Sequence, residues 1–215
     1  MGRISDWINR QRHNRGYGVQ SPSSFFFVTQ VLKERLPYYA YPILEKIAKE
    51  EKNSAKRIKE LFRITNHHNP VNCIAIGSPS AACAMATAKP SADKHCFADK
   101  QPGRLASALL ASHDCPIKEG NPLELLKSTL KGTGEVGMLY IGNIPQRAEL
   151  LEEALPYTNK KSIIVIEGIH GDEETKAWWQ TVVDNPATVV TYDLYSIGLL
   201  LFDNERIKQH YTLKR

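Results

Sequence analysis

The acid–base candidates of this sequence lie in one short segment, Glu167-Gly168-Ile169-His170-Gly171. It directly follows an apolar run that predicts a buried strand, so its side chains are expected at the end of that strand. A carboxylate or an imidazole placed there, between flexible glycines, could take up or release a proton during catalysis. The alternative is that Glu167 and His170 both have structural roles.

Three more polar or small residues follow the ends of predicted strands. Asp99 closes the second strand, where an acid can accept hydrogen bonds from ribose hydroxyls or stabilise the N-terminus of the next helix. Asn121 follows the third strand and could bind an adenine edge or cap the next helix. Gly142 follows the fourth strand. Together these positions predict a ligand site at one edge of a sheet.

The segment from Val71 to Ala88 predicts a strand, a tight turn and a helix. Gly77 ends the strand and permits a backbone conformation that other residues avoid. Ser78 is suited to cap the helix and Pro79 to be its first residue. Such a turn leaves backbone N–H groups and a positive dipole end at the carboxyl edge of the sheet, where open α/β sheets bind ligands.

These residues need a parallel sheet to bring them together. From Val71 onward, strands alternate with helices, which predicts an α/β fold with a Rossmann-like sheet and helices on both faces. The last two strands, at 198–202 and 210–213, have no long helix between them and predict an antiparallel finish. The expected strands before them are 73–76, 96–98, 116–118, 138–141, 163–166 and 189–192.

About seventy residues with a helical pattern precede the first strand, which divides the chain into a helical extension, 1–69, and a sheet domain, 70–215. Residues 3–12 could form an amphipathic helix that docks on the body of the protein or on a second copy, giving a homodimer. The loop after it contains Tyr17 and Gln20. It is either a surface connector or a lid on the substrate side.

The composition is that of a soluble globular protein, with 215 residues, 42% hydrophobic residues, 24% charged residues and a net charge of +5. The basic residues cluster at 3–15 and 46–63, but no aromatic-lined groove accompanies them, so nucleic acid is not the expected partner. The four cysteines lack metal-ligand spacing and suit a reducing cytoplasm. No signal peptide and no membrane-spanning run is visible.

His67 and His68 are adjacent at the end of a predicted helix. Neighbouring helical residues face different directions, so a shared metal ion is less favoured than a role at the helix C-terminus, where cations are stabilised.

With these motifs in place, nearly the whole chain resembles a class I S-adenosylmethionine-dependent methyltransferase. It is most similar to the small O-methyltransferase-like proteins of Bacteroidetes, through its segments 15–22 and 191–211. Ile76-Gly77-Ser78 resembles motif I, and Asp99 matches the ribose-binding acid of motif II. Gly120-Asn121 lies where the adenine-side motif belongs, and the segment from Glu167 to His170 matches the one after strand five. The resemblance implies a seven-stranded sheet whose last-added strand is antiparallel.

The chain departs from this family at three positions. The resemblance places an acid that holds the methionine ammonium at position 75, where this chain has Ala75, and Ala81 replaces the second glycine of motif I. Without another partner for the ammonium, the lost bond would cost about 1.5–3 kcal/mol, roughly ten- to a hundredfold in affinity. Gly142 stands where metal-dependent relatives carry an Asp, so the resemblance implies no catalytic metal.

Two functions follow from the resemblance. The first is an enzyme that transfers a methyl group from S-adenosylmethionine to an oxygen of a small molecule. Gly77, Ser78, Asp99, Asn121 and Gly142 would bind the cofactor, with Glu167 or His170 as base. The second is a methyltransferase-fold protein that has lost its cofactor site and serves as a binding or scaffold subunit.

Overall fold

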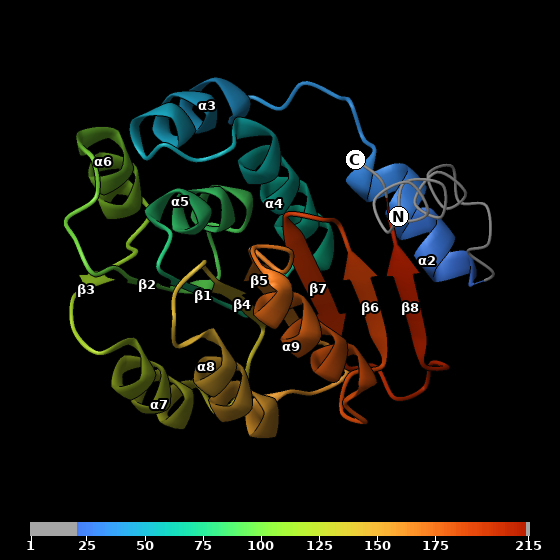
Figure 1. Ribbon diagram of the computed structural model, residues 1–215. Coiled ribbons are helices and arrows are strands. Elements are labelled where there is room, and N and C mark those ends of the chain that lie inside the picture. The colour runs from blue at the N-terminus through green and yellow to red at the C-terminus, as the bar shows by residue number, and fades with distance from the viewer. Residues whose placement is uncertain (1–20, 214–215) are drawn as a thin grey trace.

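Eight strands form one mixed sheet in the computed structural model, which describes residues 21–213 (Figure 1). Their order across the sheet is β3-β2-β1-β4-β5-β7-β6-β8. The expected α/β fold is therefore confirmed. In chain order the strands are β1 Asn72–Ile76, β2 Asp93–Phe97, β3 Ile117–Lys118, β4 Met138–Ile141, β5 Ile163–Glu167, β6 Val190–Asp193, β7 Ile197–Leu201 and β8 Gln209–Thr212.

The C-terminal end of the sheet differs from the expected seven strands with an antiparallel last strand. The first five strands are parallel, and β7 runs antiparallel between β5 and β6. With both edges of β7 paired, β8 reaches a free edge only on the far side of β6. It pairs there in parallel, Tyr192 opposite Tyr211, and becomes the eighth strand.

Helices cover both faces of this sheet, in three layers (Figure 1). One face carries α2, the π-helix η2 and α3 to α6, and the other carries α7, α8 and α9. The described helices are α2 Pro22–Phe26, η2 Phe27–Leu32, α3 Tyr41–Glu50, α4 Ala55–His68, α5 Pro79–Ala88, α6 Arg104–Ser112, α7 Pro122–Thr133, α8 Arg147–Ala154, the short η3 Leu155–Tyr157 and α9 Glu173–Asp184.

Alternating side chains of the strands build two separate hydrophobic cores. In β1, Cys73 and Ala75 face the layer that contains α4 and α5, whereas Ile74 and Ile76 face α7 and α8. The central parallel strands β1, β4 and β5 are buried on both faces, which explains why they consist of apolar runs rather than alternating patterns. This burial fixes the register of the strands, since a slip by one residue would move each side chain to the opposite core.

All four cysteines are free and buried in one half of this architecture. Cys73 lies in β1, Cys83 in α5 and Cys96 in β2, with Cys115 just before β3. Burial raises the pKa of every one of these thiols, to about 11 for Cys115. They therefore behave as small hydrophobic residues, as the apolar sequence context of Cys73, Cys83 and Cys96 predicts.

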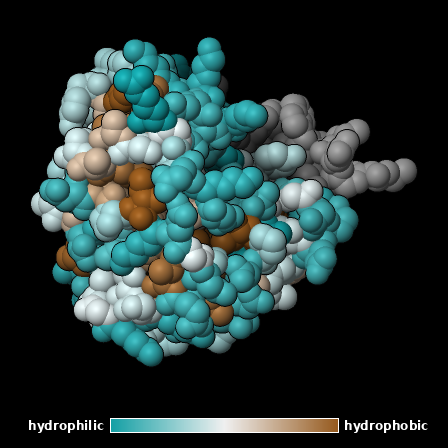
Figure 2. Space-filling view, turned by 90° about the vertical axis from the view of Figure 1, so that its left-hand side faces the viewer, coloured by the Kyte–Doolittle hydropathy of each residue, from teal (hydrophilic) through white to brown (hydrophobic). Residues whose placement is uncertain are grey.

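The surface that Figure 2 shows is mostly hydrophilic, with apolar groups in separate patches. Such scattered apolar groups are usual on a surface in contact with water. Within residues 21–213, no helix is long and apolar enough to cross a membrane.

Candidate functional site

The turn after β1 has the geometry that its sequence predicts. Gly77 has φ +72°, in the left-handed region, and Ser78 caps α5 by accepting a bond from the Ala81 N–H at 3.4 Å. Pro79 is the first residue of the helix. The strand, the glycine turn and the capped helix are thus confirmed as local structure, at the carboxyl edge of the sheet.

The loop between β4 and α8 lies directly against this turn. A Cβ atom built on Gly77 would come within 2.8 Å of Ile144 Cγ2. One built on Gly142 would lie 2.9 Å from the carbonyl oxygen of Ile76, and the Gly142 N–H donates to that same oxygen at 2.8 Å. Two glycines therefore allow the carboxyl ends of β1 and β4 to approach closely.

The loop between α3 and α4 reaches the N-termini of two helices of the sheet domain. Asn53 Nδ2 donates to Ser78 Oγ at 3.3 Å and to Ser80 Oγ at 2.8 Å, at the start of α5. Glu51 Oε1 accepts from the Gly103 N–H at 2.6 Å, where α6 begins. Carboxylates are stabilised at helix N-termini, so this loop is held by electrostatics as well as by hydrogen bonds.

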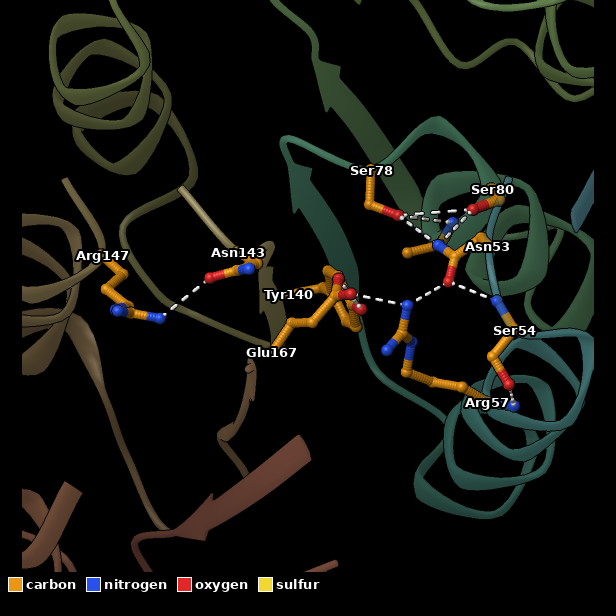
Figure 3. Close-up of polar contacts among 10 residues, drawn as sticks. Asn53, Ser54, Arg57, Ser78, Ser80, Tyr140, Asn143, Arg147 and Glu167 are labelled. Atoms are coloured by element: carbon orange, nitrogen blue, oxygen red, sulfur yellow. Dashed lines mark hydrogen bonds and ion pairs between the residues drawn. The ribbon is translucent and has the colours of Figure 1, made fainter. Parts of the chain in front are cut away.

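An ion pair connects the first turn of α4, which directly follows this loop, to the end of β5 (Figure 3). Arg57 Nη2 lies 2.5 Å from Glu167 Oε1, and both side chains are 15% exposed. Asn53 Oδ1 accepts a second bond from Arg57 Nη2. Ser54 caps α4 by accepting from the Arg57 N–H, so the cap and the ion pair place Arg57 at the site.

Tyr140 completes the network from within the sheet. Its hydroxyl donates to Glu167 Oε2 at 2.7 Å, and its ring is fully buried next to Ala75 in the register of β1 and β4. Burial and the Glu167 carboxylate raise the pKa of Tyr140 well above 10. Both oxygens of Glu167 therefore have hydrogen-bond donors, which stabilises a charged carboxylate at a partly buried position.

The second acid–base candidate has different partners from the first. His170 Nε2 lies 2.7 Å from Asp193 Oδ2, at the end of β6. The His170 ring stacks on Tyr195, with 5.3 Å between ring centroids and an angle of 11°. Asp193 is buried and its Oδ1 accepts from the Tyr195 N–H, so its position is fixed. A carboxylate that holds an imidazole in this way orients it as a base.

The remaining predicted site residues are spread along this edge. Asp99 is exposed, two residues beyond the end of β2. Asn121 Oδ1 caps α7 by accepting from the N–H groups of Leu123 at 2.9 Å and Glu124 at 3.4 Å.

Tyr17, Gln20 and the amphipathic segment 3–12 lie outside the described residues. In the described part of the chain, no three His, Cys, Asp or Glu side chains are grouped in a way that could hold a metal ion.

The site contains residues that the sequence pattern did not identify. Asn53 and Arg57 lie in the helical extension, within the basic stretch 46–63, for which the sequence predicts no site role, and Tyr140 has the pattern of a core residue. A local signal does exist for the placement of Arg57, because Ser54 is a typical cap residue and Arg57 lies in the first turn of the helix that it caps. The partner of Arg57 could not be predicted, since Glu167 is far away in the chain.

Solved structures of O-methyltransferases share this architecture. TomG from Streptomyces achromogenes, an O-methyltransferase solved with S-adenosylmethionine, has a TM-score of 0.59 at 17% identity, covering 90% of this chain and 98% of its own. A methyltransferase from Geobacter sulfurreducens has a TM-score of 0.58 at 14% identity, covering 85% and 96%. An O-methyltransferase from Bacillus cereus, solved with S-adenosylhomocysteine, has a TM-score of 0.57 at 12% identity, covering 83% and 97%.

No family model and no curated protein sequence matches the chain. At these identities the structural comparisons define the fold alone. The chain has the fold of class I S-adenosylmethionine-dependent O-methyltransferases.

Proposed function

We propose that this chain binds S-adenosylmethionine at the carboxyl edge of its sheet and transfers the methyl group to an oxygen of a small molecule. The observation that carries the proposal is the turn from β1 into the capped helix α5, with exposed Asp99 beyond the neighbouring strand β2. These residues fit the nucleoside end of the cofactor, because an acid there can accept bonds from ribose hydroxyls. The similar folds solved with S-adenosylmethionine or S-adenosylhomocysteine add support.

In this proposal each residue of the edge has a separate task. Gly77, Ser78 and Gly142 shape the backbone around the cofactor, and Asp99 holds its ribose, with Asn121 on the adenine side. S-adenosylmethionine, when bound, supplies an electrophilic methyl group.

His170 is the better of the two proposed bases. Glu167 already binds Arg57 and Tyr140, whereas Asp193 holds the ring of His170 in place. His170 would take the proton of the acceptor hydroxyl, and positioning supplies much of the rate.

A second candidate function is a binding or scaffold subunit without methyl transfer. It is favoured by the contacts that the α3–α4 loop makes at this edge, through Asn53 to α5 and through Glu51 to α6. Ala75 supports it as well, because it offers no charge to the amino-acid end of the cofactor. In this alternative the chain's own side chains take the place of ligand contacts.

The organisation of the chain also belongs to the proposal. The helical part, 1–69, would cover the sheet domain, 70–215, with Tyr17 and Gln20 on the substrate side. A homodimer would form through the N-terminal helices, the location would be cytoplasmic, and nucleic acid would not be a partner.

Calorimetric titration with S-adenosylmethionine and S-adenosylhomocysteine tests the two functions. The enzyme proposal expects saturable binding that weakens at least tenfold in Asp99→Ala, about 1.4 kcal/mol or more. Glu152→Ala, an exposed acid in α8, is the matched control and should bind like the wild type. If millimolar ligand produces no heat and no thermal shift, the enzyme proposal is refuted. Binding that depends on Asp99 would refute the scaffold proposal in its simple form.

A further inference from the structure

The Arg57–Glu167 ion pair lies where the turn, the α3–α4 loop and the end of β5 meet. Asn53 bonds both Arg57 and the first turn of α5, and Tyr140 joins Glu167 to the strand beside Ala75 (Figure 3). The pair therefore lies next to the turn at Gly77, on which the proposed cofactor site depends. The side chains that hydrogen-bond to its two charged groups are neutral: the phenol of Tyr140 and the amide of Asn53.

The guanidinium of Arg57 has an unused hydrogen-bond donor. Its Nη2 bonds Glu167 and Asn53, whereas its Nε is buried and has no acceptor among residues 21–213. A buried donor without an acceptor costs about 1–3 kcal/mol. The Nε and Nη2 groups together form the fork that binds a carboxylate through two parallel bonds. Glu167 uses only one arm of this fork.

The amino-acid end of S-adenosylmethionine carries the complementary charges. It is a zwitterion, with one ammonium and one carboxylate, and the ion pair offers one carboxylate and one guanidinium. Exchange of partners would leave no charge unpaired, which is the condition for keeping charges in a partly buried place. The ligand carboxylate would also provide an acceptor for Arg57 Nε.

We infer that Arg57 and Glu167 together bind the amino-acid end of the S-adenosyl ligand, with Arg57 on its carboxylate and Glu167 on its ammonium. Tyr140 and Asn53 position these two side chains. This inference rests on the proposed function, and it assigns the role that Ala75 cannot fill to residues of α4 and β5.

The test compares two ligands that differ in the amino-acid end alone. S-adenosylhomocysteine has this end and methylthioadenosine lacks it. In the wild type, calorimetry should give an affinity for S-adenosylhomocysteine that is at least roughly tenfold higher. In Arg57→Gln/Glu167→Gln, which removes both charges at once, this preference should disappear while methylthioadenosine binds unchanged.

A neighbouring ion pair provides the matched control. Lys59 and Glu45 lie 2.7 Å apart between α4 and α3, and Lys59→Gln/Glu45→Gln removes the same two charges. This variant should keep the ligand preference of the wild type. If the first double variant does not fold, Arg57→Lys keeps the charge and removes the fork, and it should weaken S-adenosylhomocysteine alone.

The results separate this inference from the proposed function. If both ligands bind the wild type equally, or if the folded Arg57 variants keep the preference, the inference is overturned and the nucleoside site remains. If neither ligand binds the wild type, the inference and the proposed function are both refuted.

Discussion

Replacing Gly142 by alanine measures how tightly the carboxyl ends of β1 and β4 are packed. The new Cβ atom would lie 2.9 Å from the carbonyl oxygen of Ile76, and 3.1 Å and 3.2 Å from the carbonyl oxygen and carbon of Gly77. All three contacts are with backbone atoms of a buried strand and its turn, so no side-chain rotation can relieve them. Overpacking of this kind costs about 1–3 kcal/mol. In a chain of this size that lowers the melting temperature by about 2–12 °C.

Gly132→Ala is the control, and it is expected to raise the stability rather than lower it. Gly132 is the last residue but one of α7, and a Cβ atom there would meet nothing within 4 Å. Alanine in a helix interior is better than glycine by about 0.5–1 kcal/mol, so this variant near the helix end should be more stable than the wild type by up to that amount. Thermal melting followed by circular dichroism, with urea unfolding for the free energy, compares the two variants. A Gly142→Ala protein as stable as the wild type would show that the strand ends separate easily, and would refute the reasoning.

Three further substitutions test the polar and titratable groups. Tyr140→Phe removes the donor to Glu167 and should lower the free energy of unfolding by about 1.5–3 kcal/mol in urea titrations; an unchanged midpoint would contradict it. Burial raises the pKa of Cys96 from 9.0 to about 12. As the pH rises, the thiol loses its proton in the unfolded chain before it does so in the folded chain. Cys96 therefore makes its full contribution to the free energy of unfolding below pH 9.0, and this contribution is lost as the pH rises towards 12. Stability should fall less steeply over that range in Cys96→Ala, and equal slopes would argue against a buried thiol. Burial lowers the pKa of His68 below 6.5, so its contribution is present above pH 6.5 and is lost on acidification. His68→Gln should lose less stability than the wild type in acid unfolding, and a steeper loss would contradict this.

The sequence predicts well what short-range chemistry decides. Gly77, Ser78 and Pro79 specify a turn and a helix start with no help from the rest of the chain, and the structure has both. Asn121 is a similar case, because its capping of α7 depends on the next three residues. The apolar runs locate β1, β4 and β5, since burial on both faces leaves a simple pattern, whereas β2 begins with the polar residues Asp93 to His95, three residues before the predicted strand.

Contacts between segments that are distant in the chain could not be predicted from the sequence. Glu167 and His170 lie close together in the chain, yet Glu167 pairs with Arg57 and His170 pairs with Asp193. The place of β8 depends on which strand edge is still open after β7 has paired, and no local pattern of Gln209–Thr212 contains that information. Asn53 is of a residue type that is common in loops, and its hydrogen bonds to α5 result from the way the helices pack on this face of the sheet.

The buried cysteines give this chain its own reporters of partial opening. Modification of a thiol needs the thiolate and access of the reagent, and the native fold denies both at Cys73, Cys83, Cys96 and Cys115. All four lie in or beside the part of the molecule built from β1, β2, β3 and α5, and the strands from β5 to β8 contain none. The labelling rate under native conditions therefore reports the opening of that part alone. Hydrogen exchange in β5 to β8 would then show whether the two halves of the sheet open together or as separate cooperative units.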